Sequence, residues 1–481
     1  MGGIGNGLIR IDCPGSSFEG VDGVLHTQMS IFESQSGRRT RTPSITPRKY
    51  KVAGLFAGIG GIELGLGRAG HETVLFSEID PSAIAVLKAG FGGVPNHPDV
   101  TRISKLPSEV DLLTGGFPCQ DLSQAGLTVG IKGTRSSLVA HVLRLLRERP
   151  VETILLENVP FMLQLARGQA MNYIVGELET LGYKWAYRVV DSRAFGLPHR
   201  RRRVYLVASQ SLDPRRVVFA DEAGGRDSVV DDWRSVACGF YWTEGVRGLG
   251  WAVDAVPTLK GGSTVGIPSP PAVVMPSGTV VTPSIRAAER LQGFRADWTQ
   301  PAEKAGRASL RWKLVGNAVT VPAATWIGRR LSRPGEPLPL GECEMLPMRT
   351  WPNAAYNVGD GRVAVTASEW PKCYLQRASL AEYLKVEHRP LSIKATTGFL
   401  KRTERSGLKF PLGFLDVLRQ HVEDSKIVAG LKKRNGNSRT RRCAHGPQDL
   451  PSNGQDSTAE HGGRTSSAET LSRARPTIHD G

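Results

Sequence analysis

The chain has 481 residues, with 62 lysines and arginines against 45 aspartates and glutamates, so its formal net charge is +17. This length predicts about two to four folded units, and a hydrophobic content of 40% is sufficient for a buried core. The sequence contains no run of about 18 apolar residues and no apolar segment after its first methionine, so we expect neither a membrane-spanning helix nor a secretory signal.

The cysteines and the charge narrow the class of protein further. Six cysteines lie far apart and form no CxxC pair, which argues against a disulfide scaffold and against a zinc ribbon. We therefore predict no metal site and a reducing, cytoplasmic environment. The excess of positive charge favours a polyanionic partner.

The first 209 residues divide into two parts. Residues 1–48 are rich in glycine, serine and threonine and show no sustained apolar period, so we predict disorder there. From 49 to 209, short apolar runs alternate with helical patterns. The predicted strands are 52–56, 73–77, 110–114, 153–156 and 204–208, and the predicted helices are 62–69, 81–89, 138–149 and 168–181. This alternation predicts an α/β domain with a largely parallel sheet covered by helices on both faces.

The rest of the chain is less regular. Residues 210–282 interrupt the alternation with glycine, proline and tryptophan, and residues 283–333 return to helical patterns. Residues 334–429 read as a proline-rich linker and a small accessory module of unknown role. The polar composition from 430 to 481 predicts a basic, disordered tail.

A glycine-rich turn joins the first predicted strand to the first helix. It reads Phe56-Ala57-Gly58-Ile59-Gly60-Gly61, and glycines at such a junction let a ligand approach the helix N-terminus. The second strand ends at Glu78, 20 residues after Gly58, a spacing that suits a carboxylate bound to a ribose diol. The alternative is a tight turn with a helix-capping acid. No Gly-Lys-Ser/Thr follows, so a nucleoside is favoured over a nucleotide phosphate.

A cysteine and a glutamate follow two other predicted strands. Cys119 comes after Gly115-Gly116-Phe117-Pro118, and ligands of parallel sheets bind beyond the carboxyl ends of the strands. Glu157 directly follows the strand 153–156, where partial burial should raise its pKa. Glu157 alone reads equally well as a helix cap or a surface ion pair. Two reactive side chains at the ends of strands in one sheet favour a shared site.

A run of basic residues leads into the last strand of this part. It reads His199-Arg200-Arg201-Arg202-Arg203. Such runs are commonly solvated faces or loose phosphate-binding patches. Because side chains alternate along a strand, we predict that Arg201 and Arg203 face a site and that Arg202 faces solvent.

These motifs, taken in order, resemble the DNA (cytosine-5)-methyltransferase family. The glycine-rich turn is followed by Pro118-Cys119-Gln120, Glu157-Asn158-Val159, the basic run, Arg290-Leu291-Gln292-Gly293-Phe294 and Gly316-Asn317-Ala318-Val319. One tripeptide would be weak evidence, but six motifs in order over residues 50–333 are hard to obtain by chance.

The resemblance implies a fold and its division. It implies an α/β fold with a Rossmann-like class I S-adenosylmethionine-dependent methyltransferase sheet and a smaller inserted target recognition domain. Residues 49–209 and 283–333 would form the catalytic domain, and residues 210–282 the target recognition domain.

The resemblance also implies roles for single residues. Six would surround S-adenosylmethionine, with Glu78 at the ribose hydroxyls, Asp99 near the adenine amine and Asn317 at the methionine end. The full set is Phe56, Gly58, Gly60, Glu78, Asp99 and Asn317.

Four residues would carry the chemistry on cytosine. Cys119 would be the nucleophile that attacks C6, Glu157 would bind N3, Arg203 would bind O2 and Arg201 would brace the active-site loop. No metal would take part.

The implied activity is sequence-specific methylation of a flipped-out cytosine at C5 in double-stranded DNA. We expect a monomer in a prokaryotic cytoplasm, associated with the nucleoid and without a membrane partner. It would be the modification enzyme of a restriction-modification system, with a cognate restriction endonuclease encoded nearby. A tRNA cytosine-C5 methyltransferase of the same fold is the alternative. A binding protein that has lost catalysis is disfavoured by the intact Cys119, Glu157 and Arg203.

Four positions depart from the family pattern. His199 stands where the family has glutamine, Gly54 replaces an acid, Arg295 replaces a proline and Leu122 replaces an aromatic residue. The first could alter loop support, and the second could remove one cofactor contact. None of the four changes the catalytic cysteine or glutamate.

Overall fold

The computed structural model describes residues 46–118, 138–224, 230–261, 268–345, 350–373 and 378–442, with side chains as far as residue 431. The chain divides into two compact units, Met1–Lys426 and Ile427–Gly481, and the sites discussed below belong to the first. Cys119, Leu122 and the predicted disorder at 1–45 and 443–481 lie outside the described residues.

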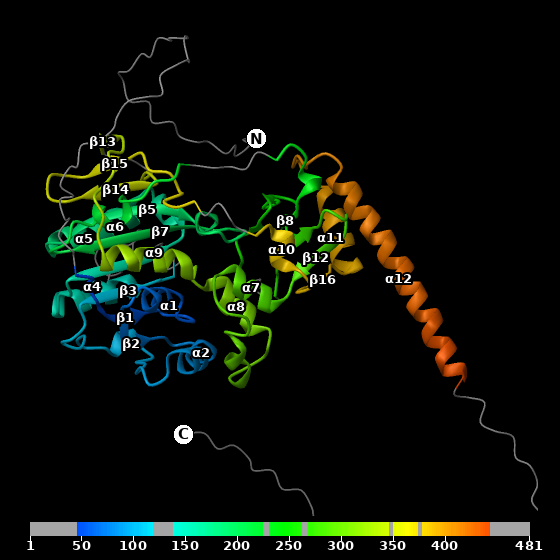
Figure 1. Ribbon diagram of the computed structural model, residues 1–481, viewed down its shortest axis with the longest axis horizontal. Helices are drawn as coiled ribbons and strands as arrows, with labels where there is room; N and C mark the ends of the chain where they lie inside the picture. The colour runs from blue at the N-terminus through cyan, green and yellow to red at the C-terminus, as the bar shows by residue number, and fades with distance from the viewer. Residues whose placement is uncertain are drawn as a thin grey trace, which may run out of the picture. The chain divides into compact units, whose positions relative to one another are not determined.

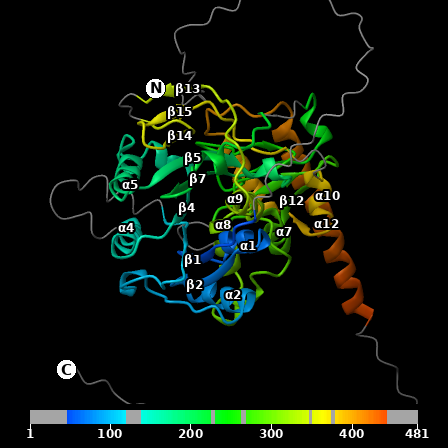
Figure 2. The same cartoon turned by 60° about the vertical axis from the view of Figure 1, so that its left-hand side comes forward.

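A nine-stranded sheet forms the larger part of the first unit (Figures 1 and 2). β2, β1, β3 and β4 are parallel to one another, whereas each neighbouring pair from β4 to β13 is antiparallel. The predicted parallel sheet is therefore correct for these four strands only. From one edge to the other, the strands are β13 (Glu342–Glu344), β15 (Val363–Val365), β14 (Ala354–Asn357), β5 (Lys184–Asp191), β7 (Arg202–Ser209), β4 (Thr153–Asn158), β3 (Leu112–Gly115), β1 (Lys51–Leu55) and β2 (Glu72–Ser77).

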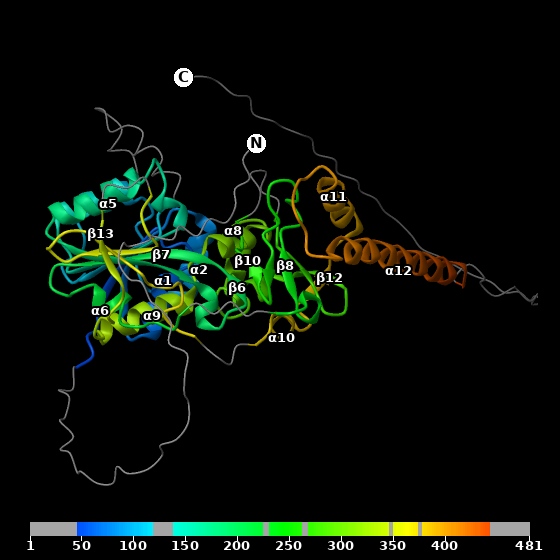
Figure 3. The same ribbon diagram turned by 90° about the horizontal axis from the view of Figure 1, so that it is seen from above.

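Helices cover both faces of this sheet, which confirms the predicted α/β fold. Figure 3 shows α5 on one face and α6 and α9 on the other. A Cβ on Gly65 would lie 2.5 Å from the Cβ of Ala324, so α1 and α9 approach closely only because Gly65 has no side chain. One face carries α1 (Gly61–Arg68), α6 (Arg215–Val218) and α9 (Val321–Ser332), and the other carries α4 (Leu138–Glu148) and α5 (Gln169–Thr180).

The strand β5 is absent from the sequence prediction. Arg188 lies in the middle of this strand and interrupts its apolar pattern, yet its side chain is completely buried. Its guanidinium donates to the carbonyl oxygens of Ser368 (2.7 Å) and Asp221 (2.6 Å) and to the carboxylate of Glu222 (2.6 Å). A charge can be buried when such partners surround it, and those partners come from distant parts of the chain.

A second, smaller sheet has five strands. In its core, Phe240 packs with Phe399, Phe414 and Leu418, three residues that lie much later in the sequence. In Figure 1 the helices α10, α11 and α12 lie beside β8 and β12. The strands are, in order, β16 (His388–Pro390), β12 (Val280–Pro283), β11 (Ala272–Val274), β8 (Cys238–Phe240) and β9 (Ala252–Val253), and the helices are α10 (Leu380–Leu384), α11 (Ile393–Thr403) and α12 (Phe414–Arg442).

This arrangement corrects the predicted linker and accessory module at 334–429. Residues 342–365 extend the large sheet through β13, β14 and β15, and residues 380–422 complete the small sheet and its core. The predicted tail is also helical at its start, because α12 extends to Arg442. At the other end, residue 48 is ordered, and Arg48 donates its backbone N–H to Ser332 (3.0 Å).

The remaining elements lie between the strands and helices already described. No helix in the described part of the chain is long and apolar enough to cross a membrane. These elements are α2 (Pro81–Phe91), η1 (Val100–Arg102), η2 (Pro160–Leu163), η3 (Ser192–Phe195), β6 (His199–Arg200), η4 (Trp233–Ser235), β10 (Val256–Pro257), α7 (Ile285–Leu291), η5 (Gln300–Lys304) and α8 (Leu310–Asn317).

Candidate active site

The glycine-rich turn after β1 has an unusual backbone. Phe56, Gly58 and Gly60 have φ angles of 54°, 57° and 77°. This left-handed region suits glycine but strains phenylalanine by about 1–3 kcal/mol, and such strain is concentrated at functional sites. A Cβ on Gly60 would collide with the ring of Phe91, whereas no described atom lies within 4 Å of a Cβ on Gly58. The turn therefore leaves space for a ligand above Gly58.

Glu78 closes this turn from the end of β2. Its Oε2 accepts a hydrogen bond from the backbone N–H of Gly58 (2.7 Å), and its Oε1 accepts one from Asp80 (2.8 Å). Each carboxylate oxygen can accept a further bond. The predicted pair of glycine turn and acid thus forms one structure, with the carboxylate half-buried beside the turn.

Asp99 lies on the segment that borders Glu78. Asn96 accepts from the backbone N–H of Glu78 (3.0 Å) and donates to its carbonyl oxygen (3.1 Å), which holds residues 96–99 beside the end of β2. The Asp99 carboxylate caps η1 by accepting from the backbone N–H (2.9 Å) and the hydroxyl (2.7 Å) of Thr101, and these bonds lower its pKa. The two predicted cofactor acids therefore come from adjacent segments.

Glu157 and the two predicted arginines meet at the end of β4. The Glu157 side chain is buried, with 7% of the residue exposed, and its Oε1 lies 3.0 Å from Nε of Arg203. Burial raises the pKa of Glu157, and the charges of Arg203 and Arg201 oppose that rise. Arg202 is exposed and pairs with Glu369, as the predicted alternation requires. The site holds a carboxyl group with increased proton affinity.

The chain that enters Cys119 passes directly beside Glu157. The side chain of Asn158 donates to the carbonyl oxygen of Phe117 (3.0 Å), and a Cβ on Gly116 would lie 3.5 Å from Oε2 of Glu157. Cys119 itself lies outside the described residues, as does the loop that follows it. The residues up to Pro118 lead the chain past the carboxyl group.

Arg201 and His199 bond to backbone groups near α7, α9 and β10. Arg201 is almost fully buried and donates to the carbonyl oxygens of Ala318 (2.7 Å) and Leu259 (3.3 Å). His199 lies between the carbonyl oxygen of Leu291 (3.1 Å from Nδ1) and the backbone N–H of Leu259, which donates to Nε2 (3.0 Å). Nδ1 must therefore carry the proton, and burial lowers the pKa of His199 well below its usual value. The ring stays neutral and connects β6 to the end of α7 and to the segment after β10.

Asn317 is far from the other predicted cofactor residues in the sequence, but its helix is linked to the segment that carries Glu78. It is exposed at the end of α8, and a Cβ on Gly261 would lie 2.8 Å from its Oδ1. Lys313 of the same helix bonds to Asp80 (2.9 Å), the residue that caps α2 beside Glu78. The structure thus links α8 to the segment that carries Glu78.

Two buried residues near the site escaped the sequence prediction. Gln292 is fully buried, donates to the carbonyl oxygen of Val315 (2.9 Å) and accepts from the hydroxyl of Thr320 (3.1 Å). It supports the end of α8, where Asn317 lies, and the turn from α8 to α9. The sequence signal for Gln292 was a polar side chain between the apolar residues Leu291 and Phe294.

The other missed residue is Glu63, in the first turn of α1. Its carboxyl accepts from the hydroxyl of Thr114 (2.8 Å) and fills the space above Gly54, where a Cβ would collide with it. Burial raises the pKa of Glu63 to about 7. The Glu63 carboxyl therefore occupies the space that a side chain at position 54 would need.

The described residues contain no group of three or more histidine, cysteine, aspartate or glutamate side chains that could hold a metal ion. The predicted catalytic and cofactor residues that are described lie at the carboxyl edge of the parallel strands or on elements that border it. That edge is where ligands of such sheets bind.

Comparisons with known proteins show which family the chain resembles. The chain matches the family model of C-5 cytosine-specific DNA methylases over residues 50–222. It is 49% identical over 368 residues to Type II methyltransferase M2.BsuMI of Bacillus subtilis (strain 168), a match that covers 74% of this chain and 93% of that protein.

Two further matches are shorter or more distant. The chain is 41% identical over 180 residues to Type II methyltransferase M1.ScrFI of Lactococcus lactis subsp. cremoris, covering 35% of this chain and 45% of that protein. The crystal structure of S. pombe Dnmt2 methyltransferase aligns with a TM-score of 0.41 at 17% identity, covering 59% of this chain and 98% of that one.

Proposed function

The chain belongs to the C-5 cytosine-specific DNA methylase family, and from this premise we propose that it methylates a flipped-out cytosine in duplex DNA through a covalent adduct with Cys119. The observation that carries the proposal is the buried Glu157–Arg203 pair beside the segment that leads into Cys119. Methyltransferases of this family use S-adenosylmethionine, and this chain is a DNA (cytosine-5-)-methyltransferase.

The glycine-rich turn and its neighbours fit S-adenosylmethionine. The space above Gly58 admits a ligand, and Glu78 keeps hydrogen-bonding capacity for a ribose diol. Asp99 is available to the adenine amine from the adjoining segment, and Asn317 to the methionine end. Phe56 and Gly60 complete the proposed pocket. When bound, the cofactor supplies an electrophilic methyl group to C5 of the cytosine.

The remaining steps belong to the residues of the chain. C6 of a stacked cytosine is inaccessible, so the base must leave the helix before it can react. The Cys119 thiolate adds to C6, and the protonated Glu157 carboxyl donates its proton to N3, which makes C5 nucleophilic. Arg203 binds O2 and holds Glu157 in place. After methylation, a water molecule takes the C5 proton and the thiolate leaves C6, while the N3 proton returns to the Glu157 carboxylate, which restores the neutral aromatic ring and the enzyme.

We propose that the small sheet reads the DNA sequence. It corresponds to the recognition segment expected at 210–282, but its strands begin at Cys238 and its fifth strand and part of its core come from residues 380–422. To give this chain the sequence specificity of a relative, both segments would therefore have to be replaced by those of the relative. The Type II names of the similar proteins support a role as the modification enzyme of a restriction-modification system.

The covalent step can be tested with duplex DNA that carries 5-fluorocytosine at the target position. Fluorine cannot leave C5 as a cation, so the enzyme should remain attached by a thioether bond that survives a denaturing gel. Cys119→Ser should abolish the adduct, because a serine hydroxyl stays protonated near neutral pH.

Cys238→Ser is the matched control. Cys238 is buried in the small sheet, and burial raises the pKa of its thiol to about 11, so it should not react. An adduct that persists in Cys119→Ser, or is absent from active wild-type protein, would show that Cys119 is not the nucleophile. Labelled methyl transfer to tRNA instead of duplex DNA would support the alternative substrate.

A further inference from the structure

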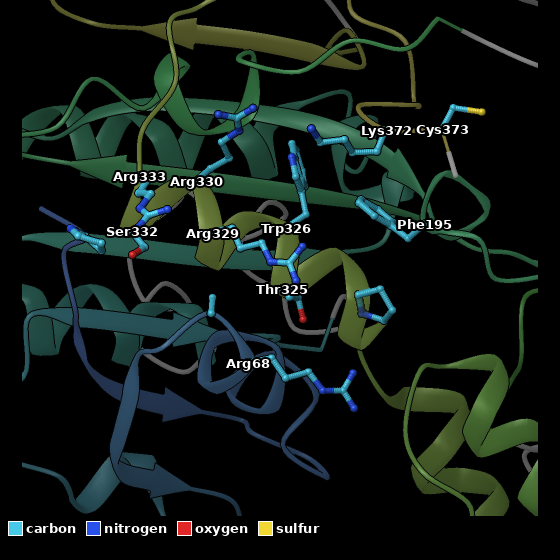
Figure 4. A pocket seen from close by; sticks show the side chains of 13 residues that line it. Arg68, Phe195, Thr325, Trp326, Arg329, Arg330, Ser332, Arg333, Lys372 and Cys373 are labelled. Atoms are coloured by element: carbon cyan, nitrogen blue, oxygen red, sulfur yellow. The ribbon is translucent and has the colours of Figure 1, made fainter. Parts of the chain in front are cut away.

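A basic cavity lies beside α9, and none of the proposed catalytic residues is among its described lining residues. Its volume is about 1000 Å³, and it is bordered by α1, η3, α9 and the segment around Lys372 (Figure 4). Five cationic side chains line it, and none of the described lining residues carries a carboxylate. They are Arg68, Arg329, Arg330, Arg333 and Lys372. We propose that this cavity binds phosphates of the DNA backbone that flanks the target cytosine.

Two of the five cations are held in place by one acid. Asp221 pairs with Arg330 and with Lys372 (2.6 Å) and accepts from the indole N–H of Trp326 (2.7 Å). These contacts hold the pKa of Asp221 at about 2, so its carboxylate is charged at neutral pH. One negative charge thus fixes two positive ones, and a net positive charge remains.

The other three cations have no acidic partner among the described residues. Arg68 donates only to the carbonyl oxygen of Gly293, at 3.3 Å, and no ion pair involves Arg329 or Arg333 in the part of the chain that the structure describes. All three side chains are exposed. Figure 4 shows Arg68 on α1 and Arg329 on the neighbouring helix α9. Guanidinium groups bind phosphate oxygens through two parallel hydrogen bonds.

The lining favours a backbone over a free nucleotide. The aromatic residues Phe195 and Trp326 are only 7% and 5% exposed, so they offer little surface for stacking a base. The cavity lies at the upper end of the range of about 300–1000 Å³ for small-molecule sites, which is more than one phosphate requires. Several cations with little aromatic surface suit consecutive phosphates.

The cavity is within reach of DNA bound at the catalytic edge. α9 begins at Val321, directly after the turn that carries Asn317, and Arg329 and Arg333 lie about 12 and 18 Å further along its axis at 1.5 Å per residue. Eighteen ångströms correspond to about five base-pair steps of duplex DNA. This proposal rests on the proposed function in DNA methylation.

The test compares two triple variants with the same loss of charge. Arg68→Gln, Arg329→Gln and Arg333→Gln together remove the uncompensated guanidinium groups. The control combines Lys105→Gln, Arg167→Gln and Lys184→Gln, three exposed cations outside the cavity. Binding to a duplex of about 30 base pairs is measured by fluorescence anisotropy between about 50 and 200 mM salt. Duplex DNA carries about one negative charge per 1.7 Å of helix axis.

The cavity variant should lose about two to three units of the slope of log affinity against log salt, since each phosphate contact contributes about 0.9. Its maximal methylation rate on saturating genomic DNA and its melting temperature should match wild type, and the control should keep the wild-type slope. An unchanged slope in the cavity variant, or an equal loss in the control, overturns the proposal.

Two further arms separate the explanations. Inorganic tripolyphosphate is titrated into wild type and the cavity variant by calorimetry. If it binds wild type alone while the DNA slopes are equal, the site takes a small polyanion and the assignment to DNA is wrong. If wild type transfers no methyl group to DNA at all, the proposed function fails first.

Discussion

The nine-stranded sheet and the five-stranded sheet are assembled in different ways. The catalytic half of the large sheet, from β1 to β4, uses consecutive strand and helix segments between residues 51 and 158. The small sheet pairs β12 with β16 across more than 100 residues of chain and buries Phe240 against Phe414. The comparison teaches that the chemistry depends on local motifs, whereas the proposed recognition surface depends on distant segments.

The largest effect is expected in the catalytic region, for Glu157→Gln. The amide cannot donate a carboxyl proton to N3, so the methylation rate should fall by about 10²- to 10⁴-fold. Because burial raises the pKa of Glu157, wild type should lose activity as pH rises through that raised pKa, and the variant should not. Single-turnover methyl transfer from about pH 6 to about pH 9 measures both.

Glu177→Gln, at a carboxylate of α5 that pairs with Arg147 of α4, is the control for this change and should keep the wild-type rate. Equal S-adenosylmethionine affinity in both variants separates loss of chemistry from loss of the cofactor site. A variant at position 157 that retains the full rate would exclude a proton-donating role.

Phe414→Ala tests whether the C-terminal segment stabilises the small sheet. Phe414 is fully buried against Phe240 and Trp251, with ring centroids 5.1 Å from each. Its removal should cost about 3–5 kcal/mol, so DNA binding should weaken while S-adenosylmethionine binding persists. Calorimetric unfolding and cofactor titration check the two halves. Leu412→Ala, at a side chain that is 87% exposed, should change neither.

Glu63→Gln should reveal a pH-dependent weakness inside the catalytic region. The folded pKa of about 7 exceeds the ordinary value of 4.5, so folding disfavours the charged form. Wild type should lose up to about 3 kcal/mol of unfolding free energy relative to the variant as pH rises through this window, because each pKa unit corresponds to about 1.4 kcal/mol.

Urea unfolding below about pH 5 and above about pH 7 measures the difference. The two proteins should be of similar stability at the lower pH, and the variant should be more stable at the higher one. The same substitution at exposed Glu72 is the control. A stability difference that is constant with pH would mean that Glu63 does not titrate in this range.

The smallest effect is expected for His199→Gln, a conservative change between β6 and its neighbours. His199→Gln can still donate to the carbonyl oxygen of Leu291 and accept from the N–H of Leu259, so it should change stability by less than about 1 kcal/mol. His199→Ala leaves both backbone groups unpaired and should cost about 1–3 kcal/mol for each. Thermal unfolding measures both changes, and equal losses would show that the two hydrogen bonds contribute nothing.

The sequence by itself determined the alternating strands and helices, the glycine-rich turn and the acids that follow β2 and β4. These features follow from local rules, since apolar periodicity sets the elements and the carboxyl ends of parallel strands share one edge. In the structure Glu78 accepts from the backbone N–H of Gly58, and Glu157 lies beside Arg203.

Only the tertiary structure decided which distant segments complete each sheet. Arg188 interrupts the apolar pattern of β5, so the pattern does not predict this strand. The hydrogen-bonding partners of Arg188 lie at residues 218–222 and 368, and the neighbouring sequence does not indicate them. The position of Glu63 in the space above Gly54 is likewise a contact between a helix and a strand that the neighbouring sequence does not indicate. The second segment of the small sheet could not be assigned from composition, because strand pairing between β12 and β16 depends on contacts that sequence spacing does not encode.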